Sequence, residues 1–376
     1  MFDCSTKEND HVNHRRQIGT WTLKDAAQAH AHGTTSHDTT SHGQDDIPGN
    51  LSRRSFVAFG ATAVACAALP SCVSQSGATD SDSRSSGDSS LALWTGNESG
   101  TYYELGSVLA QHANDNAGLD IVVMSSEGSK ENVLSLENGS AQLAFCQADI
   151  MSYAYLGEGI SEGAAPIDCF SVVASLYEEM VQIVTCDPAI TSVADLMGRN
   201  VSVSTANSGV HFNALDILGS YGIAEYDITP KHMTFQQSAD ALVDGSIDAA
   251  FVVAGIPTSV VSSMASMKDI HLVGVDKDHI ASLISKSPFY AEAVIPAGTY
   301  VGQDDDVVTL SVSAVMLAHN SCSEQDIYAL AADVFGNLPE LADSYDLFGE
   351  FSIEKGASVT VVPYHPGAAR YFQEKG

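Results

Sequence analysis

The residues of this sequence that could bind a small molecule lie in short turns rich in glycine and hydroxyl groups. The first turn spans residues 95–103 (TGNESGTYY), between a predicted strand and a predicted helix. Gly100 permits a tight backbone path, so the amide groups and the Thr101 hydroxyl at the helix start can point at an anion. No lysine follows the glycines, as it would in a Walker loop. We expect Gly100, Thr101 and Tyr102 to contact a ligand, although such turns are also common structural joints.

A second turn, residues 125–132 (SSEGSKEN), repeats this pattern after the next predicted strand. Ser129 is placed to cap the helix that follows, and Asn132 lies three residues further on, where it could face the same space. Simple capping is an alternative role for Ser129, but it does not explain Asn132. The sequence predicts both residues as ligand contacts.

The third turn, residues 146–149 (CQAD), follows a predicted buried strand. Ligands of open α/β sheets bind beyond the carboxyl ends of the strands, which is where Gln147 and Asp149 lie in the sequence. Gln147 could bind a carboxylate or an amide. Asp149 could accept a hydrogen bond from an ammonium group, or it could cap the following helix.

The fourth turn, residues 204–210 (STANSGV), comes from the second half of the chain and again opens a helix. Two opposed turns of this kind suit a small acid better than either does alone. Its candidate ligand contacts are Thr205, Asn207, Ser208 and Gly209.

The turn after a predicted strand at 251–253 adds Gly255 and Pro257 as a further wall of the same space. Catalytic patterns are absent from the sequence, which has no GxSxG, no HExxH and no Ser-His-Asp arrangement in a recognisable context. His211 is a lone histidine at a helix start, where capping is the more common role. The sequence therefore predicts a protein that is not an enzyme and has no cofactor or metal site.

Short apolar runs that alternate with helical stretches must position these turns. The expected buried strands include Leu91–Trp94, Ile121–Met124 and 141–146, with helices near 103–114 and 130–137 between them. Strands that alternate with helices predict right-handed crossovers and a mostly parallel sheet that is covered on both faces.

The same pattern then restarts. The second set of expected elements comprises strands at 181–185, 201–204 and 247–253, a short helix at 192–196, a helix at 208–219, a strand at 307–317 and helices at 323–336 and 366–373. We predict an α/β fold of two lobes with a ligand cleft between them. Lobe 1 would comprise residues 91–180 and 306–376, and lobe 2 would comprise residues 181–305.

An export signal is predicted before the two lobes, at residues 51–72. Arg53 and Arg54 precede about a dozen small apolar residues and a small residue before Cys72, a pattern typical of a twin-arginine signal with a lipoprotein cleavage site. The apolar run is too short to span a ~30 Å hydrocarbon core. Cys72 would become the first mature residue and carry the lipid. The alternative is a short buried helix in a cytosolic protein.

The segments on either side of this signal are poor in apolar residues. Residues 73–90 are mostly Ser, Asp and Gly, which predicts a flexible linker between a membrane anchor and a globular domain. Residues 1–50 hold six of the 13 histidines. We expect them to be a disordered leader that is lost with the signal or never translated, with a metal-binding tract as the alternative.

Composition restricts the possible partners. The formal net charge is −31, and 10 Lys and Arg face 40 Asp and Glu after Cys72, so we expect no nucleic-acid partner. No stretch is long and apolar enough for a transmembrane helix, so a transport role would need a partner that supplies the channel.

The predicted domain contains four cysteines with no CxxC or metal-type spacing. They are expected to be buried free thiols rather than disulfides: Cys146, Cys169, Cys186 and Cys322.

Ordered motifs from about residue 91 to the C-terminus resemble those of a known family. They are SGTYY (99–103), EGSKEN (127–132), AQLAFCQAD (141–149), DLMGRNVSV (195–203), NSG (207–209), DGSIDAAFVVAGIP (244–257) and YHPGAARYFQEKG (364–376). In this order and spacing, the chain resembles the TAXI-type solute receptors of tripartite ATP-independent periplasmic (TRAP) transporters.

The resemblance implies a two-lobed, type II periplasmic-binding-protein-like fold that closes on a small organic acid or an amino acid, such as a dicarboxylate or glutamate. The implied partner is a TRAP membrane permease driven by an ion gradient. With the predicted lipid anchor, the protein would sit on the outer face of the cytoplasmic membrane. Three alternatives are a ligand-sensing receptor for a signalling system, a receptor of an ABC-type importer and an α/β transferase.

The first turn departs from the pattern of that family. The family carries more glycine there and a proline after the tyrosines, where this chain has Asn97, Glu98 and Glu104. Glu98 beside an anion site would disfavour a second negative charge on the ligand, so we expect a ligand that differs from those of better-known relatives. Lys130 and Arg199 could restore the charge balance, although we expect Arg199 on an exposed turn outside the cleft.

Overall fold

The computed structural model describes residues 90–158, 163 and 165–376. The predicted leader, the export signal with Arg53, Arg54 and Cys72, and the linker up to residue 89 lie outside the described residues. No helix among the residues described is both long and apolar enough to cross a membrane.

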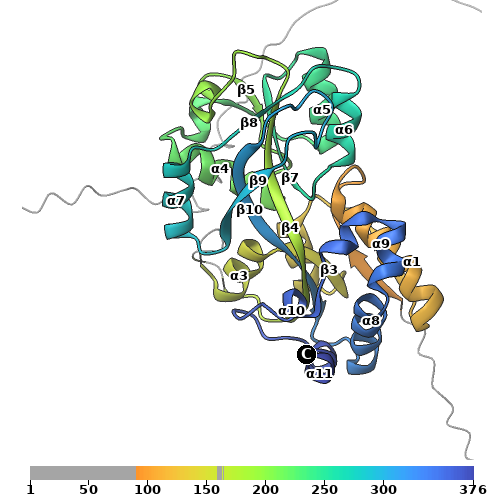
Figure 1. Cartoon of the computed structure of the whole chain (residues 1–376). Helices are drawn as coiled ribbons and strands as arrows, with labels where there is room; N and C mark the ends of the chain where they lie inside the picture. Colours follow the sequence, from red (N-terminus) through yellow and green to blue (C-terminus); the bar gives the residue numbers. More distant parts are fainter. Residues whose placement is uncertain (1–89, 159–162, 164) are drawn as a thin grey trace, which may run out of the picture. The chain divides into compact units, whose positions relative to one another are not determined.

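A ten-stranded sheet runs through the described chain in the order β2-β1-β3-β10-β4-β7-β5-β6, with β8 beside β4 and β9 beside β10. Its strands are β1 (Leu91–Trp94), β2 (Ile121–Met124), β3 (Leu143–Gln147), β4 (Phe170–Thr185), β5 (Asn200–Ser202), β6 (Thr229–Lys231), β7 (Ala249–Ala254), β8 (His271–Val273), β9 (Tyr290–Ile295) and β10 (Val307–His319). Figure 1 shows β4 and β10 side by side along the middle of the molecule.

The long strands β4 and β10 connect the two lobes. Along β4, pairing with β10 covers Phe170 to Met180, and pairing with β7 continues from Met180 to Thr185. In the same way, β10 pairs with β9 at its start and with β3 at its end. Each strand therefore belongs to lobe 1 at one end and to lobe 2 at the other.

The expectation of a mostly parallel sheet is wrong. Of the nine strand pairs among the described residues, five are antiparallel, and all five involve β4 or β10. The sequence pattern identified only residues 181–185 of the 16-residue strand β4. The rest of β4 is a mostly apolar segment interrupted by Ser171, Ser175, Glu178 and Glu179, which periodicity alone does not distinguish from other buried segments.

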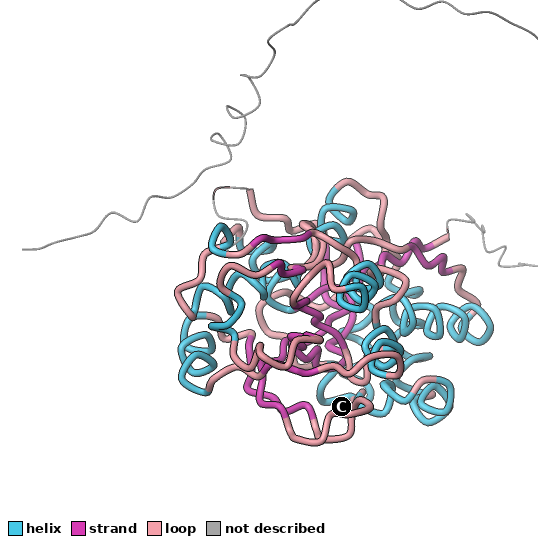
Figure 2. Tube along the Cα trace, turned by 90° about the horizontal axis from the view of Figure 1, so that it is seen from above, coloured by secondary structure: helices cyan, strands magenta, loops and turns pink. Residues whose placement is uncertain are grey.

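Helices surround this sheet, as the view from above shows (Figure 2). Lobe 1 carries α1 (Thr101–Ala117), α2 (Ser129–Glu137), α3 (Ala148–Leu156), α8 (Glu324–Gly336), α9 (Leu338–Ser344), α10 (Ile353–Gly356) and α11 (Pro366–Lys375). Lobe 2 carries α4 (Gly209–Ser220), α5 (Phe235–Asp244), α6 (Ser259–Ala265) and α7 (Lys277–Lys286). Short 3-10 helices at Val193–Leu196, Glu225–Asp227 and Asp346–Glu350 complete the described elements.

Each lobe has its own apolar core. A cluster around Phe251 fills lobe 2, while clusters around Tyr177 and Phe170 fill lobe 1. Fully burying one such aromatic side chain stabilises a fold by roughly 1.5–3 kcal/mol. Because the cores are separate, the lobes can act as two packed bodies joined through β4 and β10.

Helix α1 shows how local sequence positions the first turn. It begins after Gly100, which has an extended backbone, and ends at Gly118, which has a φ of 66°. A left-handed residue of this kind is a common helix stop. The buried side chains Leu105, Leu109 and Ala113 recur at helical spacing, so α1 packs on lobe 1 with its N-terminus directed at the space between the lobes.

The four cysteines of the domain are unpaired, as predicted. The expectation that all four are buried is wrong, because only Cys146 is buried. Cys169, Cys186 and Cys322 lie in the connections just outside strands and helices, where the chain reaches the surface and water keeps access to them.

Candidate functional site

A narrow cavity lies where the two lobes meet, with a volume of about 40 Å³. That is room for a few water-sized groups. Seven of the residues predicted from the sequence as ligand contacts line it: Gly100, Thr101, Tyr102, Ser129, Gln147, Ser208 and Gly209. The structure therefore brings together residues that are up to 109 positions apart in the chain.

Four described helices have their first residue on the wall of this cavity: α1, α2 and α4, and also α5, which begins at Phe235. Thr101, Ser129 and Gly209 are the first residues of α1, α2 and α4, and all three line the cavity. In the described part of the chain, no side chain caps α1 or α2, whereas the Ser208 Oγ accepts a hydrogen bond from the His211 N–H at the start of α4. Each helix N-terminus carries roughly half a positive charge and free N–H groups, so together they form a place for one anionic group.

The contact between α4 and β3 depends on a glycine. A Cβ at Gly209 would lie 1.7 Å from the Gln147 Oε1 atom. The Gln147 side chain donates from Nε2 to the Asn213 Oδ1 atom at 3.0 Å, and its backbone N–H donates to the Ser129 Oγ atom at 3.1 Å. Gln147 thus contacts both lobes directly.

Thr205 and Asn207 connect the lobes at the rim and do not line the cavity. The Asn207 Nδ2 atom donates to the Glu127 Oε2 atom at 2.7 Å, and the Thr205 Oγ1 atom donates to the Glu127 carbonyl at 2.9 Å. In addition, the Glu131 N–H donates to the Asn207 carbonyl at 3.1 Å. These bonds hold the starts of α2 and α4 against each other.

Asn132 and Asp149 lie behind the cavity wall. The Asn132 Nδ2 atom donates to the carbonyls of Thr95 at 2.6 Å and Phe145 at 2.7 Å, and so ties β1 to β3. The Asp149 carboxylate accepts bonds from its neighbour's backbone N–H and from the Asn213 amide at 3.0 Å. Burial raises the pKa of Asp149 to about 7.

Gly255 and Pro257 lie beside a different, open hollow that also includes Tyr345. Gly255 still bears on the cavity, because a Cβ there would lie 3.2 Å from the Thr101 Cγ2 atom. Gly255 directly follows β7, and its lack of a side chain lets the chain pass close to Thr101 at the end of the first turn.

Glu179 is a cavity residue that the sequence reasoning missed. Its side chain is only 3% exposed and lines the cavity from β4. Tyr102 donates to its Oε2 atom at 3.2 Å and Tyr177 donates to its Oε1 atom at 3.4 Å. Burial raises the pKa of Glu179 to about 8. Its sequence signal is an adjacent pair of glutamates, Glu178 and Glu179, inside a mostly apolar strand.

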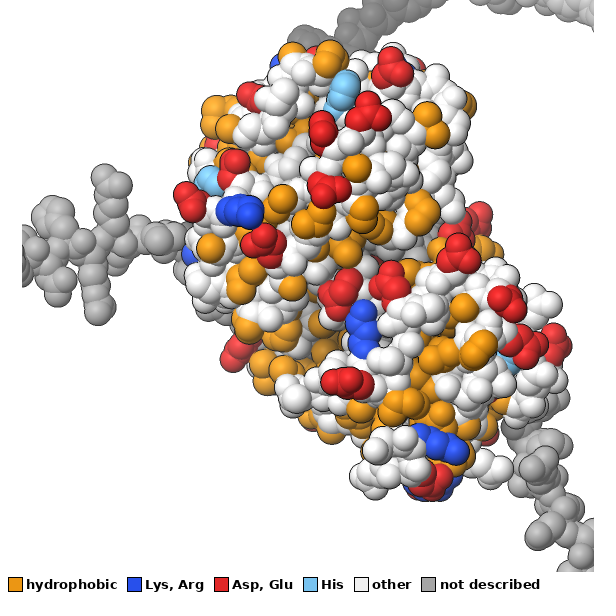
Figure 3. Space-filling model, in the orientation of Figure 1, with side chains coloured by type: hydrophobic (Ala, Val, Ile, Leu, Met, Phe, Trp, Pro, Cys, Tyr) orange, Lys and Arg blue, Asp and Glu red, His pale blue; other side chains and the backbone are white. Residues whose placement is uncertain are grey.

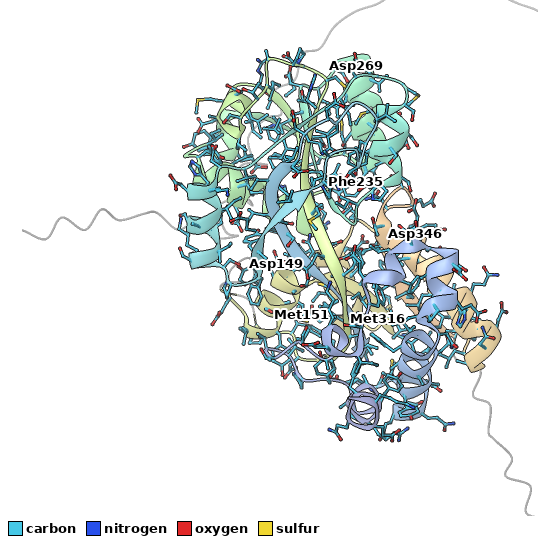
Figure 4. All side chains as sticks on the ribbon, in the orientation of Figure 1. Asp149, Met151, Phe235, Asp269, Met316 and Asp346 are labelled. Atoms are coloured by element: carbon cyan, nitrogen blue, oxygen red, sulfur yellow. The ribbon has the colours of Figure 1, made fainter. Side chains whose placement is uncertain are left out.

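Phe235 is a second lining residue that was missed, and it comes from lobe 2. Figure 4 shows Phe235 on α5 in the upper lobe and Asp149 in the lower lobe. The Phe235 ring approaches the first turn, since a Cβ at Gly100 would lie 3.4 Å from its Cε2 atom. An isolated aromatic residue at a helix start gives no sequence signal for a binding role.

Among the residues that the structure describes, no basic side chain lines the cavity. The Lys130 ammonium lies 5.5 Å from the centre of the Phe212 ring, and Arg199 pairs with Asp187 and Asp248 away from the cavity. On the visible face of the molecule, acidic side chains are spread over both lobes and basic ones are sparse (Figure 3). Within the described ranges, no cluster of three or more His, Cys, Asp or Glu could hold a metal ion.

The sequence model of the NMT1-like family matches residues 93–376. Among solved structures, the chain is similar to periplasmic binding protein BugD, with 11% identity, a TM-score of 0.50 and coverage of 76% of this chain and 93% of that one. It also matches the aliphatic sulphonate binding protein SsuA from Escherichia coli (16% identity, TM-score 0.40, 76% and 82% covered). A third match is the GluR0 ligand-binding core from Nostoc punctiforme in complex with L-glutamate (14% identity, TM-score 0.44, 68% and 98% covered). The predicted two-lobed, type II α/β fold is confirmed.

Proposed function

The chain belongs to the NMT1-like family, and from this premise we propose that the protein is an extracytoplasmic receptor that binds a small organic acid or an amino acid without turning it over. One observation carries the proposal: helices from both lobes begin at one cavity between the lobes. Periplasmic binding protein BugD, which has the same fold, supports a binding role.

The proposed mechanism is a population shift. A carboxylate placed at the N-termini of α1, α2 and α4 contacts both lobes at once. Such a ligand has a higher affinity for the closed arrangement of the lobes and therefore favours it. The separate cores of the lobes and the two connecting strands are consistent with a movement of this kind.

We further propose that the closed form delivers its ligand to a TRAP-type permease and that a lipid on Cys72 holds the receptor at the membrane. The order of the TAXI-like motifs supports the permease, and the paired Arg53 and Arg54 support export. The proposed ligand class is a small acid or amino acid, of which glutamate and the dicarboxylates are the first candidates.

Thermal unfolding of the protein against dicarboxylates, keto acids, amino acids and neutral controls tests this proposal. A ligand at 100 times its Kd adds about 2.7 kcal/mol of stability, which raises Tm by a few degrees. Stabilisation by one class of acid is the expected result. Absence of stabilisation by every compound would contradict a receptor for small acids.

The double variant Ser129→Ala and Ser208→Ala tests the site itself. We expect at least a tenfold loss of affinity, because both hydroxyls lie at the cavity. Ser323→Ala is the matched control, since Ser323 caps α8 as Ser208 caps α4 but lies outside the cavity. Unchanged affinity in the double variant would contradict the assignment.

A further inference from the structure

Glu179 is an unusual group to find at the bottom of a binding cavity. Its carboxylate is buried at the middle of β4, where the lobes join. A carboxylate offers about four acceptor positions, and the described hydrogen bonds to Glu179 come from two hydroxyls, those of Tyr102 and Tyr177. The carboxylate therefore has spare acceptor capacity on the wall of the cavity.

The cavity around Glu179 has buried acceptors that lack partners among the described residues. Its lining includes no Lys or Arg, and none of the ion pairs among the described residues includes Glu179. Gln147 Oε1 and Ser204 Oγ are buried at the same cavity without a hydrogen-bond partner in the described chain. Buried polar atoms of this kind are costly unless something pairs with them, so the cavity favours a ligand that supplies N–H donors.

We propose that Glu179 is the specificity-determining residue of this cavity and that it selects ligands with a protonated amine. This inference rests on the proposed function and narrows its ligand class. A carboxylate of the ligand lies at the helix N-termini, and its ammonium group donates to Glu179. A dicarboxylate is rejected, because its second negative charge would lie beside Glu179 with no basic side chain lining the cavity to balance it.

The groups that face Glu179 are consistent with this assignment. They are Tyr102 on α1, Tyr177 on the same strand, Cys146 on β3 and Asp149 at the start of α3. Burial raises the pKa of Glu179 most, the charge of Asp149 raises it further, and hydrogen bonds from Tyr102, Gln147 and Tyr177 oppose the shift. None of these residues carries a positive charge that could balance the Glu179 carboxylate. In the proposed complex, the ammonium group of the ligand supplies that positive charge. Its binding lowers the pKa of Glu179 and releases a proton below pH 8.

The rival arrangement has a protonated Glu179 that donates a hydrogen bond to a second carboxylate of the ligand. The two arrangements differ in a measurable way. A protonated Glu179 would bind dicarboxylates more tightly as the pH falls, and a glutamine could replace it. An ionised Glu179 paired with an ammonium group binds more tightly as the pH rises toward 8, and glutamine cannot replace its charge.

The experiment is calorimetric titration of the protein with the twenty standard amino acids and with amine-free acids of matched skeleton. Glutamate is paired with glutarate, aspartate with succinate and alanine with propionate. Glu179→Gln is compared with Glu178→Gln, a control on the same strand whose side chain is bound by Ser311 and Ser313 and lies outside the cavity. Thermal unfolding confirms that both variants are folded.

We expect at least one amino acid to bind, and its amine-free counterpart to bind about 10- to 100-fold more weakly, the usual range for a hydrogen bond to a charged group. Glu179→Gln should remove most of this discrimination, and Glu178→Gln should retain it. Tighter or equal binding of amine-free acids, or unchanged discrimination in Glu179→Gln, overturns the inference but leaves the receptor function intact. Binding of no compound at all overturns both.

Discussion

Single residues show that polar groups in this molecule serve two different purposes. Asn132 satisfies the carbonyl groups of Thr95 and Phe145 and so has a clear structural role. Glu179 is also buried, but it lacks an opposite charge and stands on the cavity wall. A buried ionisable group without a charged partner costs stability, and such groups concentrate at functional sites. Glu179 therefore makes a testable contribution to stability.

Replacement of Glu179 by glutamine should change how stability depends on pH. The pKa of Glu179 rises from 4.5 to about 8 in the folded protein, so the folded state binds the proton more tightly. Stability of the wild type is then lost as the pH rises from about 4.5 to about 8. Glu179→Gln removes this loss and should be more stable by up to about 4 kcal/mol at pH 8, with little difference at pH 4.

Urea unfolding of the ligand-free protein at pH 5, 6.5 and 8 measures this effect. Glu178→Gln serves as the control, because Glu178 is hydrogen-bonded to two serines and lies near the Lys355 ammonium. Asp149, whose pKa is raised to about 7, keeps some pH dependence in both variants. Parallel stability curves for the wild type and Glu179→Gln would show that Glu179 carries no such cost.

At the scale of elements, the site depends on how closely the start of α4 approaches lobe 1. Ser208 caps this helix, and Gly209 lets it meet the Gln147 side chain. Capping and a glycine are local sequence features. Their functional value comes from the partner element β3, which ends at the same point.

Gly209→Ala and Gly219→Ala make a matched pair within α4. At Gly209 the added Cβ would lie 1.7 Å from the Gln147 Oε1 atom, whereas nothing lies within 4 Å of a Cβ at Gly219. Gly209→Ala should therefore weaken ligand binding by at least tenfold. Gly219→Ala should leave binding unchanged and add up to about 1 kcal/mol of stability from helix propensity. Calorimetric titration and urea unfolding measure the two effects, and equal affinities for both variants would contradict this account of α4.

At the scale of the whole molecule, the lobes are held together by a few polar contacts and by two continuous strands. Asn207 reaches from lobe 2 to the Glu127 carboxylate of lobe 1 at 2.7 Å. This bond exists only when the lobes are close together, whereas the β4–β10 pairing does not depend on it. Loss of the bond should therefore act on the lobe equilibrium rather than on the fold.

Asn207→Ala should shift the lobes toward an open arrangement. A hydrogen bond to a charged group contributes about 1.5–3 kcal/mol, but exposure at the rim reduces this to about 1 kcal/mol, or roughly fivefold in the equilibrium. Small-angle scattering without added ligand should show a larger radius of gyration than for the wild type. Asn116→Ala is the control, because Asn116 bonds only to its own helix in lobe 1. A radius equal to that of the control would contradict a role for this contact.

Local sequence patterns were sufficient to predict several of the elements that carry the site, but not α5 or the part of β4 that holds Glu179. The strands Leu91–Trp94 and Ile121–Met124 and the starts of α2 and α4 follow from apolar periodicity and capping residues. The four turns also predicted seven of the residues that line the cavity. These features depend on residues that are close together in the sequence, so they can be predicted without knowledge of the fold.

Those local patterns did not predict which distant segments of the chain become neighbours in the fold. Glu179 becomes a cavity residue because distant parts of the chain, such as Tyr102, 77 positions away, meet it at the lobe junction. The antiparallel course of β4 and β10 likewise depends on which strands become neighbours. Burial, charge balance and strand direction at this junction are properties of the packed lobes. The sequence therefore identifies the helix starts that could hold an anion, and the tertiary structure adds the buried carboxylate that faces them.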